Sequence, residues 1–294
     1  MTKIKFISDL HLEFSSFPVG EDFAKEVNPD NEDLSEQILL VAGDTTLSVL
    51  FKKKNDADEI SYKRTEKEGK VARWRFSRFL HAVSGFKAVY LVAGNHEAYS
   101  GGDVLSNKAL IQEFIDDNNF TNVKFLERER VPLTDKVDLL ATTLWTDMNK
   151  DSPGDHLIVG SCMNDFRFCN YGGNKFTTRD ALREFRLSKL WLTEQLADTS
   201  KSYVVMTHHL PSFRGIDPQY KGDPMNFGYA SELDDFILQN QHITHWVHGH
   251  THYNVDYKIG ETRILGHMRG YPNEVWSKRP TNWKGFKINK CFSI

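Results

Sequence analysis

The chain has 294 residues, of which 39% are hydrophobic and 26% are charged, and its formal net charge is −3. This composition is ordinary for a soluble globular protein, and a chain of this length can bury a large core. The charge balance provides no global positive field that would attract nucleic acid or an anionic membrane. We therefore expect neither an obligatory nucleic-acid partner nor a membrane partner.

The cysteines and the amino-terminal segment indicate a cytoplasmic protein. The three cysteines form no CxxC pair and leave an odd thiol, which fits a reducing compartment. The first residues, MTKIKFISDLH, contain no apolar run of signal-peptide length before Asp9 and His11. No other window is apolar enough for a membrane span.

Short apolar segments rich in β-branched residues recur along the chain and predict strands. They cover residues 4–7, 38–42, 88–93, 137–145, 203–207 and 244–248. Their apolar residues are continuous rather than alternating, which suits strands buried on both faces. A hairpin that turns near Gly260 is expected within residues 254–268.

Helical periodicity falls between these strands. It covers residues 72–84, 105–118, 177–198 and 230–240. In the third of these, Thr177 and Asp180 have capping-box spacing, and four apolar residues share one face: Leu182, Phe185, Leu192 and Leu196. Strands that alternate with helices predict an α/β fold.

The chain shows no internal repeat and no Pro/Gly-rich linker, so residues 1–294 are expected to form a single domain. Two segments are expected to be loop excursions from it. Residues 52–70 are nearly all polar, and residues 148–176 carry Gly, Pro and Asn.

Candidate metal ligands follow five of the predicted strands. The sequences FISDLH, LLVAGD, YLVAGNHE, VVMTHH and WVHGHTH bring these side chains to strand ends: Asp9, His11, Asp44, Asn95, His96, His208, His209, His250 and His252. Each residue alone could be a turn or cap residue. Because sites in open α/β sheets form outside the carboxyl ends of strands, we expect the side chains to share one polar cavity. Glycines at 43, 94 and 249 would let the backbone bend sharply beside it.

The types of ligand indicate more than one metal ion. Two ions about 3.5–4 Å apart that share a carboxylate would use seven of these side chains, which are too many for one tetrahedral ion. The seven are Asp9, His11, Asp44, Asn95, His208, His250 and His252. The absence of cysteine ligands argues against a structural zinc site. Imidazole and oxygen ligands suit manganese, our first expectation, and also iron, zinc, cobalt or nickel, as divalent or mixed-valence pairs.

The motifs DLH, GD, GNHE, HH and GHTH, in this order and each after an apolar strand, resemble the five signature motifs of the calcineurin-like metallophosphoesterase superfamily. The resemblance covers nearly the whole chain, and the order of the motifs makes it specific. It implies a four-layered αββα sandwich in which two mixed β-sheets are flanked by helices. The segments LWTDMN, MNDFR, THHLPS, YKGDPMN and RGYP resemble a branch of small bacterial and phage-type members.

The resemblance also implies a role for each ligand. One ion would be held by Asp9, His11 and His252. The other would be held by Asn95, His208 and His250, and Asp44 would bridge the two. The first histidine of the THHxP pattern usually ligates in the superfamily, which favours His208 over His209.

His96 would face the phosphate, where it would stabilise charge or protonate the leaving oxygen, and a metal-bridging hydroxide would be the nucleophile. Protein serine/threonine phosphatases of the superfamily carry a longer GDxVDRG motif whose later aspartate orients this histidine. Here the stretch is GDTTLS, with Leu47 at the position of that aspartate. Another group must therefore orient His96.

Asn164, Arg167 and Arg269 are candidate substrate contacts, although a buried Asn-Asp pair and an Arg salt bridge would explain them equally well. The resemblance implies a dinuclear metal-dependent phosphoesterase that hydrolyses phosphodiester or phosphomonoester bonds of small molecules or nucleotides. The alternatives are a serine/threonine-type protein phosphatase and a non-catalytic scaffold on the same fold. A DNA-processing nuclease would require a basic groove or an added capping domain, and the sequence shows neither.

Overall fold

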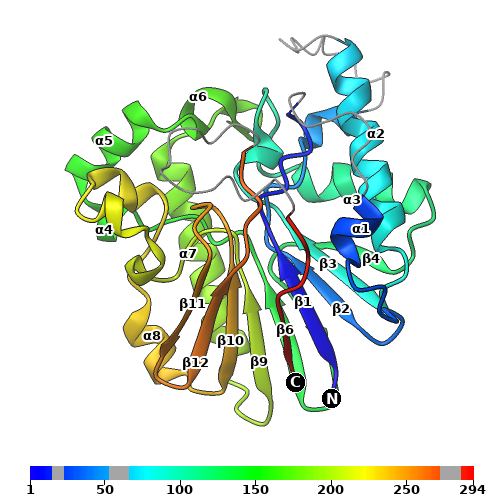
Figure 1. Cartoon of the computed structure of the whole chain (residues 1–294). Coiled ribbons are helices and arrows are strands. Elements are labelled where there is room, and N and C mark those ends of the chain that lie inside the picture. The colour runs from blue at the N-terminus through cyan, green and yellow to red at the C-terminus, as the bar shows by residue number, and fades with distance from the viewer. Residues whose placement is uncertain (15–22, 53–65, 272–285) are drawn as a thin grey trace.

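The computed structural model describes residues 1–14, 23–52, 66–271 and 286–294. Two large mixed β-sheets lie against each other, and helices cover their outer faces (Figure 1). The predicted α/β fold with four layers is therefore confirmed. The amino- and carboxyl-terminal strands run side by side at one end of the sandwich, where Thr2 and Ile294 are joined by backbone hydrogen bonds.

The first sheet has the strand order β13-β1-β2-β3-β4. Its strands are β1 (Lys3–Ile7), β2 (Ile38–Val41), β3 (Ala88–Val92), β4 (Val123–Leu126) and β13 (Cys291–Ser293). All neighbours pair in parallel except β13, which runs antiparallel to β1. The carboxyl ends of β1, β2 and β3 therefore lie at the same edge.

The second sheet has the strand order β11-β12-β10-β9-β6-β5. Its strands are β5 (Glu129–Pro132), β6 (Val137–Ala141), β9 (Ser202–Met206), β10 (Ile243–His248), β11 (Val255–Ile259) and β12 (Thr262–Gly266). The four central strands are parallel, and β11 and β5 are antiparallel edges. The predicted hairpin is β11 and β12, which turn at Gly260 with φ +57°.

Helices α1 (Phe23–Val27), α2 (Glu66–Val83) and α3 (Asn107–Asp117) lie on the first sheet, and α7 (Thr178–Gln195) and α8 (Asp234–Gln239) lie on the second (Figure 1). The rest are short: α4 (Met148–Asp151), α5 (Pro153–Cys162), α6 (Asp165–Phe168), and the 3-10 turns η1 (Ser48–Phe51), η2 (His96–Ala98), η3 (Phe213–Gly215), η4 (Pro218–Tyr220) and η5 (Pro224–Gly228). Strands β7 (Asn170–Tyr171) and β8 (Asn174–Lys175) form a small ribbon. No helix among the described residues has the length and apolar character needed to cross a membrane.

The continuous apolar strands are explained by burial on both faces. Along β2, Leu39 and Val41 pack under the helices of the first sheet, whereas Ile38 and Leu40 pack between the two sheets. The layer between the sheets also receives Val204 of β9. Because side chains alternate across a strand, one apolar run contributes to both layers, and the two sheets are held in a fixed relation.

The expected loop over 148–176 is instead mostly helical. Pro153 occupies the first turn of α5, where its missing N–H leaves no hydrogen bond unmade. Val159, Met163 and Phe176 pack into the core of the second sheet. Pro153 and Asn164 thus stand at helix starts, whereas Gly172 and Gly173 form the turn between β7 and β8. Of the other expected excursion, 52–70, residues 53–65 lie outside the described residues, and residues 66–70 begin α2.

The predicted capping box of α7 provides a test of local stability. The Thr177 hydroxyl accepts from the Asp180 N–H at 3.3 Å, and the Asp180 carboxylate accepts from the Thr177 N–H at 3.0 Å. Replacing Thr177 with alanine should lower the free energy of unfolding by about 1 kcal/mol in denaturant titrations. The exposed Thr193 is the matched control, because among the described residues its hydroxyl bonds only the Lys189 carbonyl of its own helix. Equal losses from both alanine variants would contradict the assignment.

Candidate metal centre

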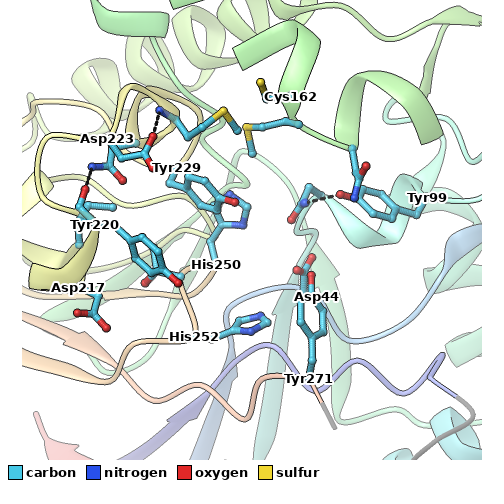
Figure 2. A pocket seen from close by; sticks show the side chains of 17 residues that line it. Asp44, Tyr99, Cys162, Asp217, Tyr220, Asp223, Tyr229, His250, His252 and Tyr271 are labelled. Carbon is cyan, nitrogen blue, oxygen red and sulfur yellow. Dashed lines mark hydrogen bonds between the residues drawn. The ribbon is translucent and has the colours of Figure 1, made fainter. Parts of the chain in front are cut away.

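The polar residues predicted at five strand ends lie at one rim of the sandwich, and all are buried. They follow β1, β2 and β3 of the first sheet and β9 and β10 of the second. Figure 2 shows Asp44, His250 and His252 around a common cavity. The structure thus brings together residues that are up to 243 positions apart in the sequence, from Asp9 to His252.

The first cluster contains Asp9, His11 and His252. The Nε2 atoms of His11 and His252 are 3.0 Å apart, and His252 Nε2 lies 3.3 Å from Asp9 Oδ1. Two ligand atoms that each bind one ion at about 2.1 Å are roughly 3.0 Å apart at right angles and roughly 3.4 Å apart in a tetrahedron. The spacing of this cluster therefore fits a single ion.

The second cluster contains Asn95, His208 and His250. Two hydrogen-bond acceptors face each other in it. His208 Nε2 lies 3.1 Å from Asn95 Oδ1 and 3.1 Å from His250 Nδ1. The other ring nitrogen of His208 donates to the Ala42 carbonyl at 2.8 Å, so Nε2 of the neutral ring carries a lone pair. The Asn95 amide nitrogen donates to Asp165, so its oxygen is an acceptor too. Two lone pairs that face each other without a proton repel, and a cation between them removes this repulsion. The residues therefore fit a metal ion.

Asp44 lies between the two clusters. Its Oδ2 is 3.7 Å from His11 Nε2, and its Oδ1 is 3.5 Å from His208 Nε2. Burial raises the pKa of Asp44 well above its ordinary value, because an isolated carboxylate is poorly solvated there. Cations on both sides would stabilise the ionised form.

Burial favours the neutral form of two imidazoles in the clusters, His11 and His250. Burial, with a contribution from His96, lowers the pKa of His11 to about 3. Burial also lowers the pKa of His250 well below its ordinary value. A neutral imidazole retains the lone pair that a metal ion requires. The pocket is thus arranged for metal binding by its desolvation as well as by its spacing.

The backbone of this site is strained at five positions. Left-handed φ values occur at Asp9 (56°), His11 (48°), Asp44 (55°), His250 (81°) and His252 (51°). Each costs roughly 1–2 kcal/mol relative to the right-handed region, and such residues cluster at functional sites. The prediction that glycines let the backbone bend sharply beside the site holds in part. Gly43 has φ +88°, but at Gly94 the reason is close approach, because a Cβ there would overlap the Asp44 carboxylate.

Glu97 holds the two loops that carry Asp44 and Asn95. Its Oε1 accepts the N–H groups of Thr45 at 2.7 Å and Thr46 at 3.3 Å. Its Oε2 accepts those of Asp44 at 3.1 Å and Gly94 at 2.6 Å. Sequence reasoning missed this role, although Glu97 directly follows His96 in the GNHE motif.

Asp165 is a second carboxylate that sequence reasoning missed. It accepts hydrogen bonds from the Asn95 amide nitrogen at 2.7 Å and from the Tyr99 hydroxyl at 2.7 Å. Because a carboxylate only accepts, it turns the Asn95 oxygen toward the second cluster. The sequence signal is the Asn-Asp pair of the MNDFR segment, in which Asn164 is a candidate substrate contact.

The three candidate substrate contacts lie in different surroundings. Asn164 lines the cavity. Arg167 is exposed and donates to the Ser161 carbonyl at 2.6 Å. Arg269 is fully buried, with Nη1 3.4 Å from the Leu10 carbonyl oxygen. Neither arginine is among the residues that line the cavity.

His96 is oriented by Glu13 and Tyr271. Its Nδ1 lies 2.9 Å from Glu13 Oε1, and its Nε2 lies 2.9 Å from the Tyr271 hydroxyl, which lines the cavity. Burial opposes the charged form, but Asp44 and Glu13 outweigh it and raise the pKa of His96. Leu47 is packed in the apolar core under the helices of the first sheet. His209 belongs to neither cluster and has Nδ1 3.4 Å from the Thr143 carbonyl oxygen.

The cavity, which the clusters line in part, has a volume of about 530 Å³. Its wall contains the side chains of four tyrosines, which come from different parts of the chain: Tyr99, Tyr220, Tyr229 and Tyr271 (Figure 2). A space of this size accepts a small molecule, and its mixed aromatic and polar wall is typical of such sites.

Replacing Glu97 with glutamine should disrupt the site, because the amide NH₂ must then face two backbone N–H donors. We expect a loss of about 1–3 kcal/mol in the free energy of unfolding, together with weaker metal binding. Denaturant titration and metal titration would measure the two effects. The exposed Glu36 is the control, since its carboxylate contacts only the Lys87 ammonium in the described structure. A Glu97→Gln variant with unchanged metal affinity would contradict this role.

Comparisons with known proteins bear on the family and the fold of the chain. A 25% identical relative, an uncharacterized protein of Acanthamoeba polyphaga mimivirus, aligns over 93% of each chain. The crystal structure of a phosphopantetheinyl hydrolase from Mycobacterium tuberculosis has the same fold, with a TM-score of 0.62, 16% identity, and coverage of 96% of this chain and 94% of that one. The family model for calcineurin-like phosphoesterases matches residues 2–254. The chain therefore belongs to the calcineurin-like phosphoesterase family.

Proposed function

We propose that this protein is a dinuclear metal-dependent hydrolase of small-molecule phosphoesters. The observation that carries the proposal is the pair of clusters described above, which meet at Asp44 beside a cavity of about 530 Å³. Asp9, His11 and His252 would hold one ion, Asn95, His208 and His250 the other, and Asp44 both. Manganese is our first choice, because imidazole, amide and carboxylate ligands occur together.

When bound, the ions would polarise the phosphoryl oxygens and lower the pKa of water. The chain supplies the orientation. His96 keeps one nitrogen on Glu13 and presents the other at the cavity wall beside Tyr271. From this position, His96 would give a proton to the leaving oxygen or stabilise charge on the phosphate.

The cavity wall favours a particular kind of substrate. Besides its tyrosines it carries Met163, Met225 and Ile216, and its carboxylates include Asp217 and Asp223. Among the described residues that line it, none is a lysine or an arginine. Carboxylates repel additional phosphates, whereas aromatic walls stack on organic groups. We therefore propose an ester with one phosphate and an apolar or aromatic organic part, not a polyphosphate.

The function is tested by hydrolysis of chromogenic esters. With Mn²⁺ present, the purified protein should cleave p-nitrophenyl phosphate or bis(p-nitrophenyl) phosphate, and chelation should abolish the activity. The value of kcat/KM for the better ester should exceed that for ATP at least about tenfold, which is roughly 1.4 kcal/mol in transition-state binding. Activity that survives full chelation would contradict the proposal, as would faster turnover of phosphoserine peptides.

Replacing His96 with alanine separates catalysis from metal binding. We expect kcat to fall by about 10²- to 10⁴-fold, because a positioned acid or base contributes that much, while the metal content stays at the wild-type value. Replacing Asp44 with alanine should remove metal, because both clusters lose a shared ligand. Elemental analysis and steady-state kinetics measure the two effects. A His96→Ala protein that loses its metal would be a ligand variant, which would contradict the proposed role.

A further inference from the structure

Glu13 is a buried carboxylate that contacts both halves of the site through a single oxygen. Its Oε1 lies 3.1 Å from His11 Nδ1 and 2.9 Å from His96 Nδ1, and its side chain is 1% exposed. The rings of His11 and His96 meet edge to face, with centroids 4.4 Å apart. One carboxylate oxygen therefore contacts two imidazoles, that of the proposed metal ligand His11 and that of the proposed catalytic residue His96.

The geometry determines which nitrogen of each ring carries a proton. A carboxylate oxygen accepts and does not donate, so both Nδ1 atoms that contact it must be protonated. The Nε2 atom of His11 is then free to present its lone pair to the cluster it shares with Asp9 and His252. The Nε2 atom of His96 is directed to the Tyr271 hydroxyl at the cavity wall.

We propose that Glu13 is a positioning residue that couples the two functions of the site. Through His11 it holds a metal ligand in its binding tautomer, and through His96 it orients the group that acts on the phosphoester. This inference rests on the proposed function. Carboxylates behind metal-binding histidines commonly have this effect on the histidine, and their removal costs about 10- to 100-fold in metal affinity or activity.

The position of Glu13 follows from the loop after β1. Asp9 and His11 both adopt left-handed φ values, and the Phe14 N–H bonds back to the His11 carbonyl at 3.1 Å. This tight turn brings the side chain at 13 under the ring at 11. Leu47, at the position where the aspartate of GDxVDRG would lie, is buried in the core, so the carboxylate comes from a different strand end.

A double-mutant cycle separates the two effects. We expect Glu13→Gln to lower kcat about 10- to 100-fold at saturating metal, with KM changed less than about twofold. On a His96→Ala background, the same substitution should lower kcat less than about threefold, because the ring that it orients is gone. The affinity for the first ion, measured by competition with a chelator, should fall about 10- to 100-fold on both backgrounds.

The buried Glu184, which bonds the Tyr171 hydroxyl and Arg128 and belongs to neither cluster, is the matched control. Its glutamine variant should keep kcat and metal affinity even if it is less stable. Equal losses of kcat from Glu13→Gln on both backgrounds would overturn the link to His96. An unchanged metal affinity would overturn the link to His11.

Nitrogen NMR of the histidine rings is an independent measurement. It uses the wild-type protein and does not depend on whether a variant folds. Both His11 and His96 should carry their proton on Nδ1, and a proton on Nε2 of a neutral ring at either residue would overturn the proposal. Neither this spectrum nor the metal competition requires a substrate. Absence of phosphoesterase activity in the wild-type protein would therefore defeat the proposed function and still leave the role of Glu13 testable.

Discussion

The structure of the site depends on one electrostatic constraint, the convergence of lone pairs that face each other when the histidine rings are neutral. His208 Nε2 and Asn95 Oδ1 face each other at 3.1 Å, and each is held in its acceptor orientation by a bond on its far side. Such an arrangement is unfavourable in a buried pocket unless positive charge occupies it. We propose that metal ions supply this charge and that Asp44, which reaches both clusters, joins them.

The fold makes this arrangement possible by packing two mixed sheets so that the carboxyl ends of their parallel strands meet. The apolar layer between the sheets holds β2 against β9, which places Asp44 beside His208. The loops beyond these strands are short, and several adopt left-handed φ values. Packing energy from the apolar layers thus offsets the local cost of strained backbone and buried charge. Glu97 contributes at the same point, since one carboxylate joins the loops after β2 and β3.

Much of this could be predicted from the sequence, because strands buried on both faces leave continuous apolar runs and the chemistry follows each run directly. The strands, the capping box of α7 and the convergence of Asp44 with the histidines were all expected. The supporting carboxylates were not. Glu13, Glu97 and Asp165 act through contacts that depend on the conformation of the loops. An acidic residue in a sequence does not reveal which groups it will contact. Arg167 and Arg269 are not among the residues that line the cavity, and their role as substrate contacts stays a prediction.

The most direct test of the central claim is anomalous scattering from crystals of the manganese-loaded protein. The account predicts two peaks about 3.5–4 Å apart, with the Asp44 carboxylate between them. One peak should lie among Asp9, His11 and His252, and the other among Asn95, His208 and His250. A single peak, or a manganese ion bound away from Asp44 with both clusters empty, would contradict the account.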